Sequence, residues 1–270
     1  MLLFSLTTLL VLLPTIVSAA IFPPDTKVKM LDPKGFRKVM KSNRTSVVAF
    51  VAPWCGHCQR MAPEYSKAAQ NLSPLIPFYA VDCDAELNKR LCAEQSFQTL
   101  VQGVQGFPTL KVFPRGGRTE PEPYDSNERT SGKFIRWASR SVPNNVKALP
   151  HIHDIPAWLD KTSDLPRVIL LNKDKKFPLL WQVLANNYGK KMAFGHHTDP
   201  NGAFAVSLGF PATVEGKTSK VIVYLPGSSV PILYEGMTKY EPLTKFFRSI
   251  LDGSADILQT SPEQSVRDEL

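Results

Sequence analysis

The 270-residue sequence has no cysteine over most of its length, since residues 93 to 270 contain none. All four cysteines lie in one short region of the first half: Cys55, Cys58, Cys83 and Cys92. Any thiol chemistry therefore belongs to the first half of the chain. The second half cannot exchange disulfides, which leaves a scaffold or client-binding role for it.

A long apolar run is also missing after the first 20 residues, so no later segment predicts a membrane span. Residues 2 to about 17 are apolar and uncharged, Pro14 interrupts them, and the small residues Ser18 to Ala20 follow. An apolar core of this length closed by small residues is typical of a secretory signal peptide, although no Lys or Arg precedes it. We therefore expect residues 1–20 to be cleaved and the mature chain to have no membrane span.

Basic residues outnumber acidic ones, with 32 Lys and Arg against 24 Asp and Glu and a net charge of +8. They are spread thinly, and the densest group lies between Lys27 and Arg44. A nucleic-acid site needs such a patch interleaved with aromatic residues or a recognisable module, and the sequence has neither. We expect no nucleic-acid partner and interpret the group as a solvated basic face, with acidic client segments as a secondary use.

The last four residues have the order of an endoplasmic reticulum retrieval signal: Arg267, Asp268, Glu269 and Leu270. Arg stands where the commonest forms of this signal have Lys or His. Coming after a signal peptide and at the C-terminus, the match favours a retrieval receptor as a partner over chance. The two ends together predict the lumen of the endoplasmic reticulum (ER), where disulfides and reducible dithiols both occur.

Apolar periodicity divides the chain into two similar halves. The first predicts strand, helix, strand, helix, two strands and a closing helix around one sheet, and the second half repeats this order. A tyrosine precedes each closing helix, Tyr124 in the first half and Tyr234 in the second. We interpret the sequence as two copies of one α/β fold, each with a central mixed sheet flanked by helices.

The predicted boundaries follow from this repeat. Residues 21–143 form the first domain, residues 144–253 the second, and residues 254–270 a polar tail. The join falls in a stretch rich in Pro and Asn, SVPNNVKALPHIHDIP, which is typical of a linker.

Cys55 and Cys58 follow a buried strand predicted over residues 45–52 and open a helix. A thiolate at a helix N-terminus faces the positive end of the dipole, which lowers its pKa, and a protonated His57 adds a nearby cation. Cys58 lies one turn into the helix, where it is suited to attack a mixed disulfide. Because a bridge between such close residues restrains almost nothing, the pair indicates a redox dithiol rather than a crosslink.

The segment Pro53-Trp54-Cys55-Gly56-His57-Cys58, the following helix with its interior Pro63, and Gly106-Phe107-Pro108-Thr109 resemble a catalytic domain of the protein disulfide isomerase family. The resemblance covers about residues 25–142. The layout is similar to that of small fungal members, with one active thioredoxin-like domain, one without cysteines and a retrieval tail. It implies tandem thioredoxin-like domains.

The resemblance also implies the roles of the site residues. Cys55 is the nucleophile and Cys58 the resolving thiol, and together they form the redox-active disulfide. Pro108 is the cis-proline that faces this disulfide, where the preceding backbone pairs with an extended substrate. Trp54 and Gly56 pack at the site.

Arg129 matches the family's mobile arginine, which helps Cys58 to ionise.

The sequence departs from the family's pattern in two places. The first is Ala49, because the family usually carries a buried glutamate six residues before its first cysteine, where it accepts the proton of the resolving thiol. Proton transfer must then use water, His57 or Arg129, which predicts slow turnover. The second departure, Gln98–Gly103, makes the approach to the cis-proline longer by about five residues, as a real loop or an error in gene prediction.

Cys83 ends a predicted strand and Cys92 lies in the following helix. Similar family members bridge such positions, so the resemblance implies a structural disulfide between the two. A zinc site made of all four cysteines is disfavoured, since their spacing lacks the paired knuckles of zinc ribbons. We expect neither a metal nor another cofactor.

Four histidines raise the question of a metal site, but they flank loops rather than share a helical face, which favours solvated loop histidines: His151, His153, His196 and His197. Asn43 opens an Asn-Arg-Thr sequon in a predicted surface turn and is a glycosylation candidate.

These features predict a protein disulfide isomerase of the ER lumen, a thiol-disulfide oxidoreductase that forms and rearranges disulfides through Cys55 and Cys58. Its partners are unfolded or misoxidised secretory proteins, and glutathione or an ER oxidase reoxidises the pair. The alternative is a client-binding chaperone with weak or no redox turnover, a view that Ala49 favours. Replacing both cysteines by serine separates the two functions.

Overall fold

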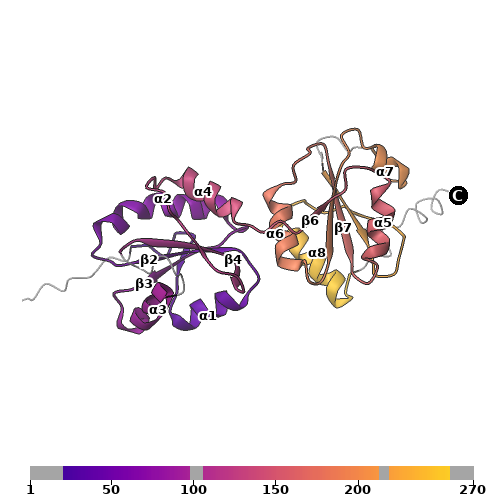
Figure 1. The fold of residues 1–270 in the computed structure, drawn as a ribbon. Helices are drawn as coiled ribbons and strands as arrows, with labels where there is room; N and C mark the ends of the chain where they lie inside the picture. Colours follow the sequence, from indigo (N-terminus) through magenta and orange to yellow (C-terminus); the bar gives the residue numbers. More distant parts are fainter. Residues whose placement is uncertain (1–20, 98–105, 213–218, 256–270) are drawn as a thin grey trace, which may run out of the picture.

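A computed structural model describes residues 21–97, 106–212 and 219–255. The expected signal peptide, the Gln98–Gly103 segment and the expected retrieval signal lie outside the described residues. No helix in the part of the chain that is described has the length and hydropathy needed to cross a membrane. Figure 1 shows two α/β units that follow one another along the chain.

The first unit is built on a five-stranded sheet in the order β1-β3-β2-β4-β5. Its strands are β1 (Val28–Met30), β2 (Ser46–Val51), β3 (Phe78–Asp82), β4 (Thr109–Gly117) and β5 (Glu122–Pro123). Strand β3 pairs in parallel with β1 and β2, whereas β4 pairs antiparallel with β2 and β5. Figure 1 places two helices on each face of the sheet, α2 (Gly56–Leu72) and α4 (Ser131–Arg140) opposite α1 (Pro33–Lys41) and α3 (Glu86–Phe97).

The second unit repeats this arrangement in the strand order β6-β8-β7-β9-β10. Its strands are β6 (Val146–Ala148), β7 (Arg167–Asn172), β8 (Ala193–Thr198), β9 (Ser219–Tyr224) and β10 (Ile232–Tyr234). Its helices are α5 (Asp154–Lys161), α6 (Leu179–Tyr188), α7 (Ala203–Ser207) and α8 (Tyr240–Asp252). The parallel and antiparallel pairs match those of the first unit, which confirms the predicted α/β class with two copies of one mixed-sheet fold.

The sequence analysis missed the first strand of each unit. Strand β1 precedes α1, and β6 lies within the stretch that was expected to be a linker. Each has only three residues, of which the first is buried and the other two are exposed. A single buried residue gives no alternating pattern, so these strands are defined by their pairing with β3 and β8 rather than by their own sequence.

Strand β2 positions the candidate site because every one of its residues is buried. Helices cover both faces of its sheet, so a continuous apolar run is needed in place of alternation. Val47, Ala49 and Val51 face the buried cluster that includes α2, while Val48 and Phe50 face the cluster that includes α1 and α3. The strand therefore leads directly from the core into the segment with the two cysteines.

The two units share an apolar contact at helix α6. Val183 of this helix belongs to the same buried cluster as the core of the first unit, and Leu179 and Tyr240 pack against that cluster. The Arg44 guanidinium of the first unit lies over the Tyr240 ring of the second, 5.4 Å from its centroid.

A pair of asparagines reinforces this interface. Asn43 donates through Nδ2 to the Asn186 carbonyl at 2.6 Å, and Asn186 donates through Nδ2 to the Asn43 carbonyl at 3.0 Å. Asn186 is only 1% exposed and also donates to the Pro114 carbonyl at 3.2 Å. The predicted open surface turn at Asn43 is therefore wrong. Glycosylation would replace one of the two hydrogens of the same Nδ2 atom, so use of the Asn43 sequon stays a prediction.

The prediction of four solvated loop histidines holds for only two of them. His151 and His153 are exposed, and their rings stack with centroids 5.1 Å apart. His196 and His197 lie buried in β8, where their ring nitrogens bond to the Asn172 side chain at 2.8 Å and to a backbone carbonyl at 2.7 Å. Burial, with the charge of His197, lowers the pKa of His196. Within the described ranges, no three His, Cys, Asp or Glu side chains gather as metal ligands would.

Candidate dithiol active site

Cys55 lies at the junction between β2 and α2, where it is the N-cap residue of the helix. Its Sγ accepts a hydrogen bond from the backbone N–H of Cys58 at 3.4 Å. When it carries a proton, the same sulfur donates to the Phe107 carbonyl at 3.4 Å. Both Cys55 and Cys58 are free thiols in this structure, and both are buried. The free N–H groups of a helix N-terminus thus point at the first thiol of the pair.

The two thiols have opposite pKa shifts. Burial alone raises the pKa of Cys55, but hydrogen bonds from the Cys58 thiol and from nearby backbone N–H groups outweigh it and lower the pKa overall. Burial raises the pKa of Cys58 to about 12, and the hydrogen bond with Cys55 acts in the same direction. One thiol therefore ionises easily and the other holds its proton.

Pro108 lies next to this pair, as expected, and the Phe107–Pro108 peptide bond is cis. Strand β4 begins at the following residue, Thr109, which pairs with Phe50 near the end of β2. The pairing brings the start of β4 beside the start of α2, so that the Phe107 carbonyl reaches Cys55.

His57 and Gly56 separate the two cysteines. The His57 side chain is exposed, and an Arg60 side-chain nitrogen lies 3.0 Å from its Nδ1. The backbone N–H of His57 donates to Cys55 and lowers the pKa of that thiol. A Cβ added at Gly56 would lie 3.4 Å from an Arg60 side-chain nitrogen, an ordinary contact distance, so space alone does not require glycine here.

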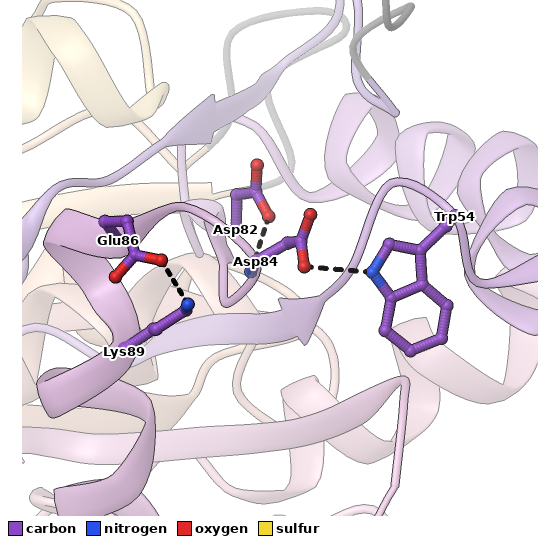
Figure 2. Close-up of polar contacts among 5 residues, drawn as sticks. All are labelled: Trp54, Asp82, Asp84, Glu86 and Lys89. Carbon is purple, nitrogen blue, oxygen red and sulfur yellow. Dashed lines mark hydrogen bonds and ion pairs between the residues drawn. The ribbon is translucent and has the colours of Figure 1, made fainter.

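Trp54 packs beside the dithiol while remaining 67% exposed. Its ring meets the Phe107 ring edge to face, with centroids 6.0 Å apart. Its Nε1–H donates to Asp84 Oδ1 at 3.0 Å, as Figure 2 shows. The sequence analysis singled out Trp54 but not Asp84, because an exposed aspartate in a turn carries no signal in the sequence.

Arg129 lies in the segment between β5 and α4, and its positive charge lowers the pKa of both thiols of the pair. Its Nε atom is buried and forms no hydrogen bond with the described residues. Glu64 of α2 accepts a hydrogen bond from the Ser131 backbone N–H at 2.7 Å, which ties the start of α4 to α2 two residues after Arg129. The sequence analysis did not find this role of Glu64.

Ala49 is 0% exposed and belongs to the same buried cluster as Cys58. The family's usual carboxylate is therefore replaced by a methyl group in a closed apolar environment. Among the described residues, the charged groups that act on the pKa of Cys58 are Cys55 and Arg129.

Cys83 and Cys92 are bonded, with an S–S distance of 2.00 Å and a Cα–Cα distance of 5.8 Å. The bond joins the residue after β3 to α3, on the face of the sheet opposite α2. Both sulfurs are used in this bond, so in this structure they are not free to bind a metal together with Cys55 and Cys58.

A comparison with protein families matches residues 27–139 to the thioredoxin family. A mitochondrial thioredoxin domain-containing protein of Schizosaccharomyces pombe is 36% identical over 58% of this chain and 42% of its own length. Protein disulfide-isomerase MPD1 of Saccharomyces cerevisiae is 30% identical over 76% of this chain and 65% of its own length. The probable protein disulfide-isomerase A4 of Caenorhabditis elegans is 37% identical over 90% of this chain and 35% of its own length.

The chain therefore spans between 42% and 65% of the length of the first relatives that it matches. Among solved structures, ERdj5 form II has a TM-score of 0.59 and 16% identity, covering 83% of this chain and 29% of that chain. At this identity the similarity concerns the fold alone.

Two mixed five-stranded sheets, each between two pairs of helices, define tandem thioredoxin-like units, and the first presents a dithiol at a strand-to-helix junction. Such a site belongs to the class of thiol-disulfide exchange proteins. Several of the relatives that the chain matches are named protein disulfide-isomerases. The chain contains a thioredoxin domain and is similar to members of the protein disulfide isomerase family.

Proposed function

We propose that this protein is a thiol-disulfide oxidoreductase and isomerase that forms and rearranges disulfides in secretory proteins. The observation that carries the proposal is the free dithiol at the start of α2, where Cys55 is the N-cap residue and the two thiols have opposite pKa shifts. The lowered pKa of Cys55 makes it the attacking group, and the raised pKa of Cys58 keeps that thiol protonated until the resolving step.

In the first step, the Cys55 thiolate attacks one sulfur of a client disulfide. The client S–S bond breaks, a mixed disulfide forms, and the second client sulfur leaves as a thiolate that takes a proton from water. If another client thiolate attacks this mixed disulfide, Cys55 is released and the client is isomerised without net oxidation.

If no client thiol attacks first, Cys58 loses its proton and attacks the Cys55 sulfur. The client leaves as a thiol, the client is reduced by two electrons, and the enzyme carries a Cys55–Cys58 disulfide. The reverse sequence oxidises a client dithiol and leaves the enzyme reduced. Glutathione disulfide or an ER oxidase then accepts the two electrons and restores the oxidised site.

The surface beside Cys55 suits an extended polypeptide. The Phe107 backbone lies next to the thiol, and the exposed Trp54 ring offers a flat apolar contact at the same edge. We infer that the client segment around its disulfide lies along this edge with its backbone close to Pro108.

We propose that rescue of a scrambled-disulfide client requires Cys55 directly. C55S is expected to abolish rescue, and C58S is expected to retain some isomerisation while accumulating mixed disulfides with the client. S66A, a substitution on α2 away from the two thiols, serves as the matched control. Rescue by C55S at the wild-type rate would show that the exchange reaction does not use this site.

A second candidate function, a client-binding chaperone with weak redox turnover, is favoured by Ala49. A buried Cys58 with a pKa of about 12 and no neighbouring carboxylate among the described residues makes the resolving step slow. The C55S/C58S double variant separates the two functions, because a chaperone would still suppress the aggregation of a reduced client. Loss of that suppression would rule out the second candidate.

We propose the lumen of the ER as the compartment. A bonded Cys83–Cys92 pair agrees with an oxidising compartment, and the sequence predicts the same location. The protein should resist added protease in intact microsomes and become digestible after detergent. Digestion without detergent would contradict this location.

A further inference from the structure

Trp54 is an exposed side chain that is held in place from two sides. Its Nε1–H donates to Asp84 Oδ1 at 3.0 Å, and its ring contacts Phe107 with an interplanar angle of 82°. Figure 2 shows the indole nitrogen directed at the Asp84 carboxylate. A large aromatic surface next to a reactive thiol is thus presented to solvent in one orientation.

Asp84 is itself restrained by the turn between β3 and α3. Its backbone N–H donates to Asp82 Oδ1 at 2.9 Å, the second contact that Figure 2 shows for this residue. Asn88 of α3 donates through Nδ2 to the Asp82 carbonyl at 2.8 Å. Lys89 forms its ion pair with Glu86, so the Asp84 carboxylate stays available to the indole.

The disulfide anchors this turn to the rest of the unit. Cys83 directly precedes Asp84 and is bonded to Cys92 in α3, and its backbone N–H donates to the Val51 carbonyl at 2.8 Å. Val51 is the last residue of β2, the strand that leads into the dithiol segment. The disulfide and this hydrogen bond therefore link the turn that carries Asp84 to α3 and to the end of β2.

The Trp54–Asp84 hydrogen bond is exposed, so it contributes little to the stability of the fold. What it fixes is the orientation of the indole. Asp84 is also absent from the groups that set the pKa of Cys55, which are backbone N–H groups, the Cys58 thiol and Arg129. Replacing Asp84 should therefore change the binding of a polypeptide rather than the reactivity of the Cys55 thiol.

We propose that Asp84 is a positioning residue that presents Trp54 to polypeptide clients, and that the Cys83–Cys92 disulfide holds Asp84 in place for this task. The inference rests on the proposed function and assigns a role in client affinity to a disulfide that lies outside the exchange reaction. A fixed indole binds an extended chain more tightly than a free one, because less side-chain freedom is lost on binding.

The test compares a polypeptide with a small disulfide. The substrates are a self-quenched peptide that contains one internal disulfide and bis(2-hydroxyethyl) disulfide, which has no polypeptide part. D84A removes the acceptor, D84N keeps a side-chain oxygen at the same place, and E94Q alters an exposed carboxylate of α3 that pairs with Arg90 rather than with Lys89 or Trp54. KM and kcat are measured for each variant on both substrates, with reduced glutathione supplying the two electrons of each turnover.

We expect D84A to raise KM for the peptide by about three- to tenfold, the factor that corresponds to immobilising one side chain on binding, with kcat unchanged. D84N and E94Q should stay close to wild type, and the rate with bis(2-hydroxyethyl) disulfide should not change. In a W54F background, which lacks the donor, D84A should have no further effect. An unchanged peptide KM in D84A, or an equal loss on the small disulfide, would overturn the proposal.

The disulfide is tested with the C83S/C92S variant, which should show the same rise in peptide KM as D84A and no additional rise when combined with it. If that variant does not fold, D84A alone still decides the role of Asp84. The indole Nε1–H signal of Trp54, assigned by its loss in W54F, should shift in the NMR spectrum of D84A and not in that of E94Q. A wild-type protein that turns over neither substrate would refute the proposed function, whereas turnover with an unaffected D84A refutes this inference alone.

Discussion

Replacing Ala49 by glutamate should accelerate the step in which Cys58 releases the client. Ala49 is fully buried in the cluster that contains Cys58, and no carboxylate among the described residues acts on that thiol. A glutamate at this position would add a proton acceptor next to the group that must ionise. Its own pKa would be raised by burial, which brings a carboxylate closer to the working range of a general base.

The expected size of the effect follows from the pKa of Cys58. With a pKa of about 12, roughly one Cys58 in 10⁵ is ionised at pH 7, against about one in 30 for an ordinary thiol. General-base catalysis typically contributes about 10²–10⁴-fold, so A49E should raise the rate of mixed-disulfide resolution by at least about a hundredfold. The added side chain overpacks a closed core, which should lower the free energy of unfolding by about 1–3 kcal/mol.

The assay is a single-turnover measurement of client release from a preformed mixed disulfide with Cys55, followed by acid quenching and mass spectrometry. A49Q is the matched control, because it has nearly the same volume and cannot accept the proton. The reasoning predicts acceleration in A49E and none in A49Q. Equal rates in the two variants would refute it, since the effect would then come from repacking rather than from proton transfer.

Three further results are expected. In the reduced protein at pH 7, iodoacetamide should alkylate Cys55 well before Cys58, and the rate at Cys55 should fall as the pH drops below its lowered pKa, as measured by peptide mass spectrometry. N186A should lower the free energy of unfolding by about 1–3 kcal/mol in a urea titration, because it removes the buried amide that donates to the Asn43 and Pro114 carbonyls. C83S/C92S should lower it by roughly 2–3 kcal/mol, the entropy of closing a short loop.

Each of these results has a contrary outcome. Equal alkylation of the two thiols at pH 7 would contradict the opposite pKa shifts. An N186A variant as stable as N187A, which alters a less buried neighbour on the same helix, would show that the interface does not depend on the asparagine pair. If C83S/C92S is as stable as the wild type, the Cys83–Cys92 disulfide does not stabilise the fold by restraining the unfolded chain.

The sequence could predict the transition from β2 to the dithiol because local signals carry it. A continuous run of β-branched and apolar residues is typical of a strand buried on both faces, and the cysteines follow at once. The same kind of pattern recurs in the second half, which is why the duplicated fold was predictable. Helix α2 was also recognised, although Pro63 lies inside it.

Features that depend on tertiary contacts were not predictable. Asn43 and Asn186 are 143 residues apart in sequence, and nothing near Asn43 indicates that its side chain meets a second unit. His196 and His197 were expected to be solvated because they flank a loop, yet pairing extends β8 past both of them and their side chains are buried. Asp84 is identified only by the hydrogen bond that it accepts from the Trp54 indole.

The most direct test of the redox function is the intact mass of the alkylated protein across a glutathione redox series, using the mature chain. The account predicts that two thiols, Cys55 and Cys58, titrate together near the poise of the ER, roughly −180 to −210 mV, while the Cys83–Cys92 bond persists throughout. A first pair that never forms a disulfide across the series, or four thiols that stay reduced together, would contradict the claim that this dithiol opens and closes.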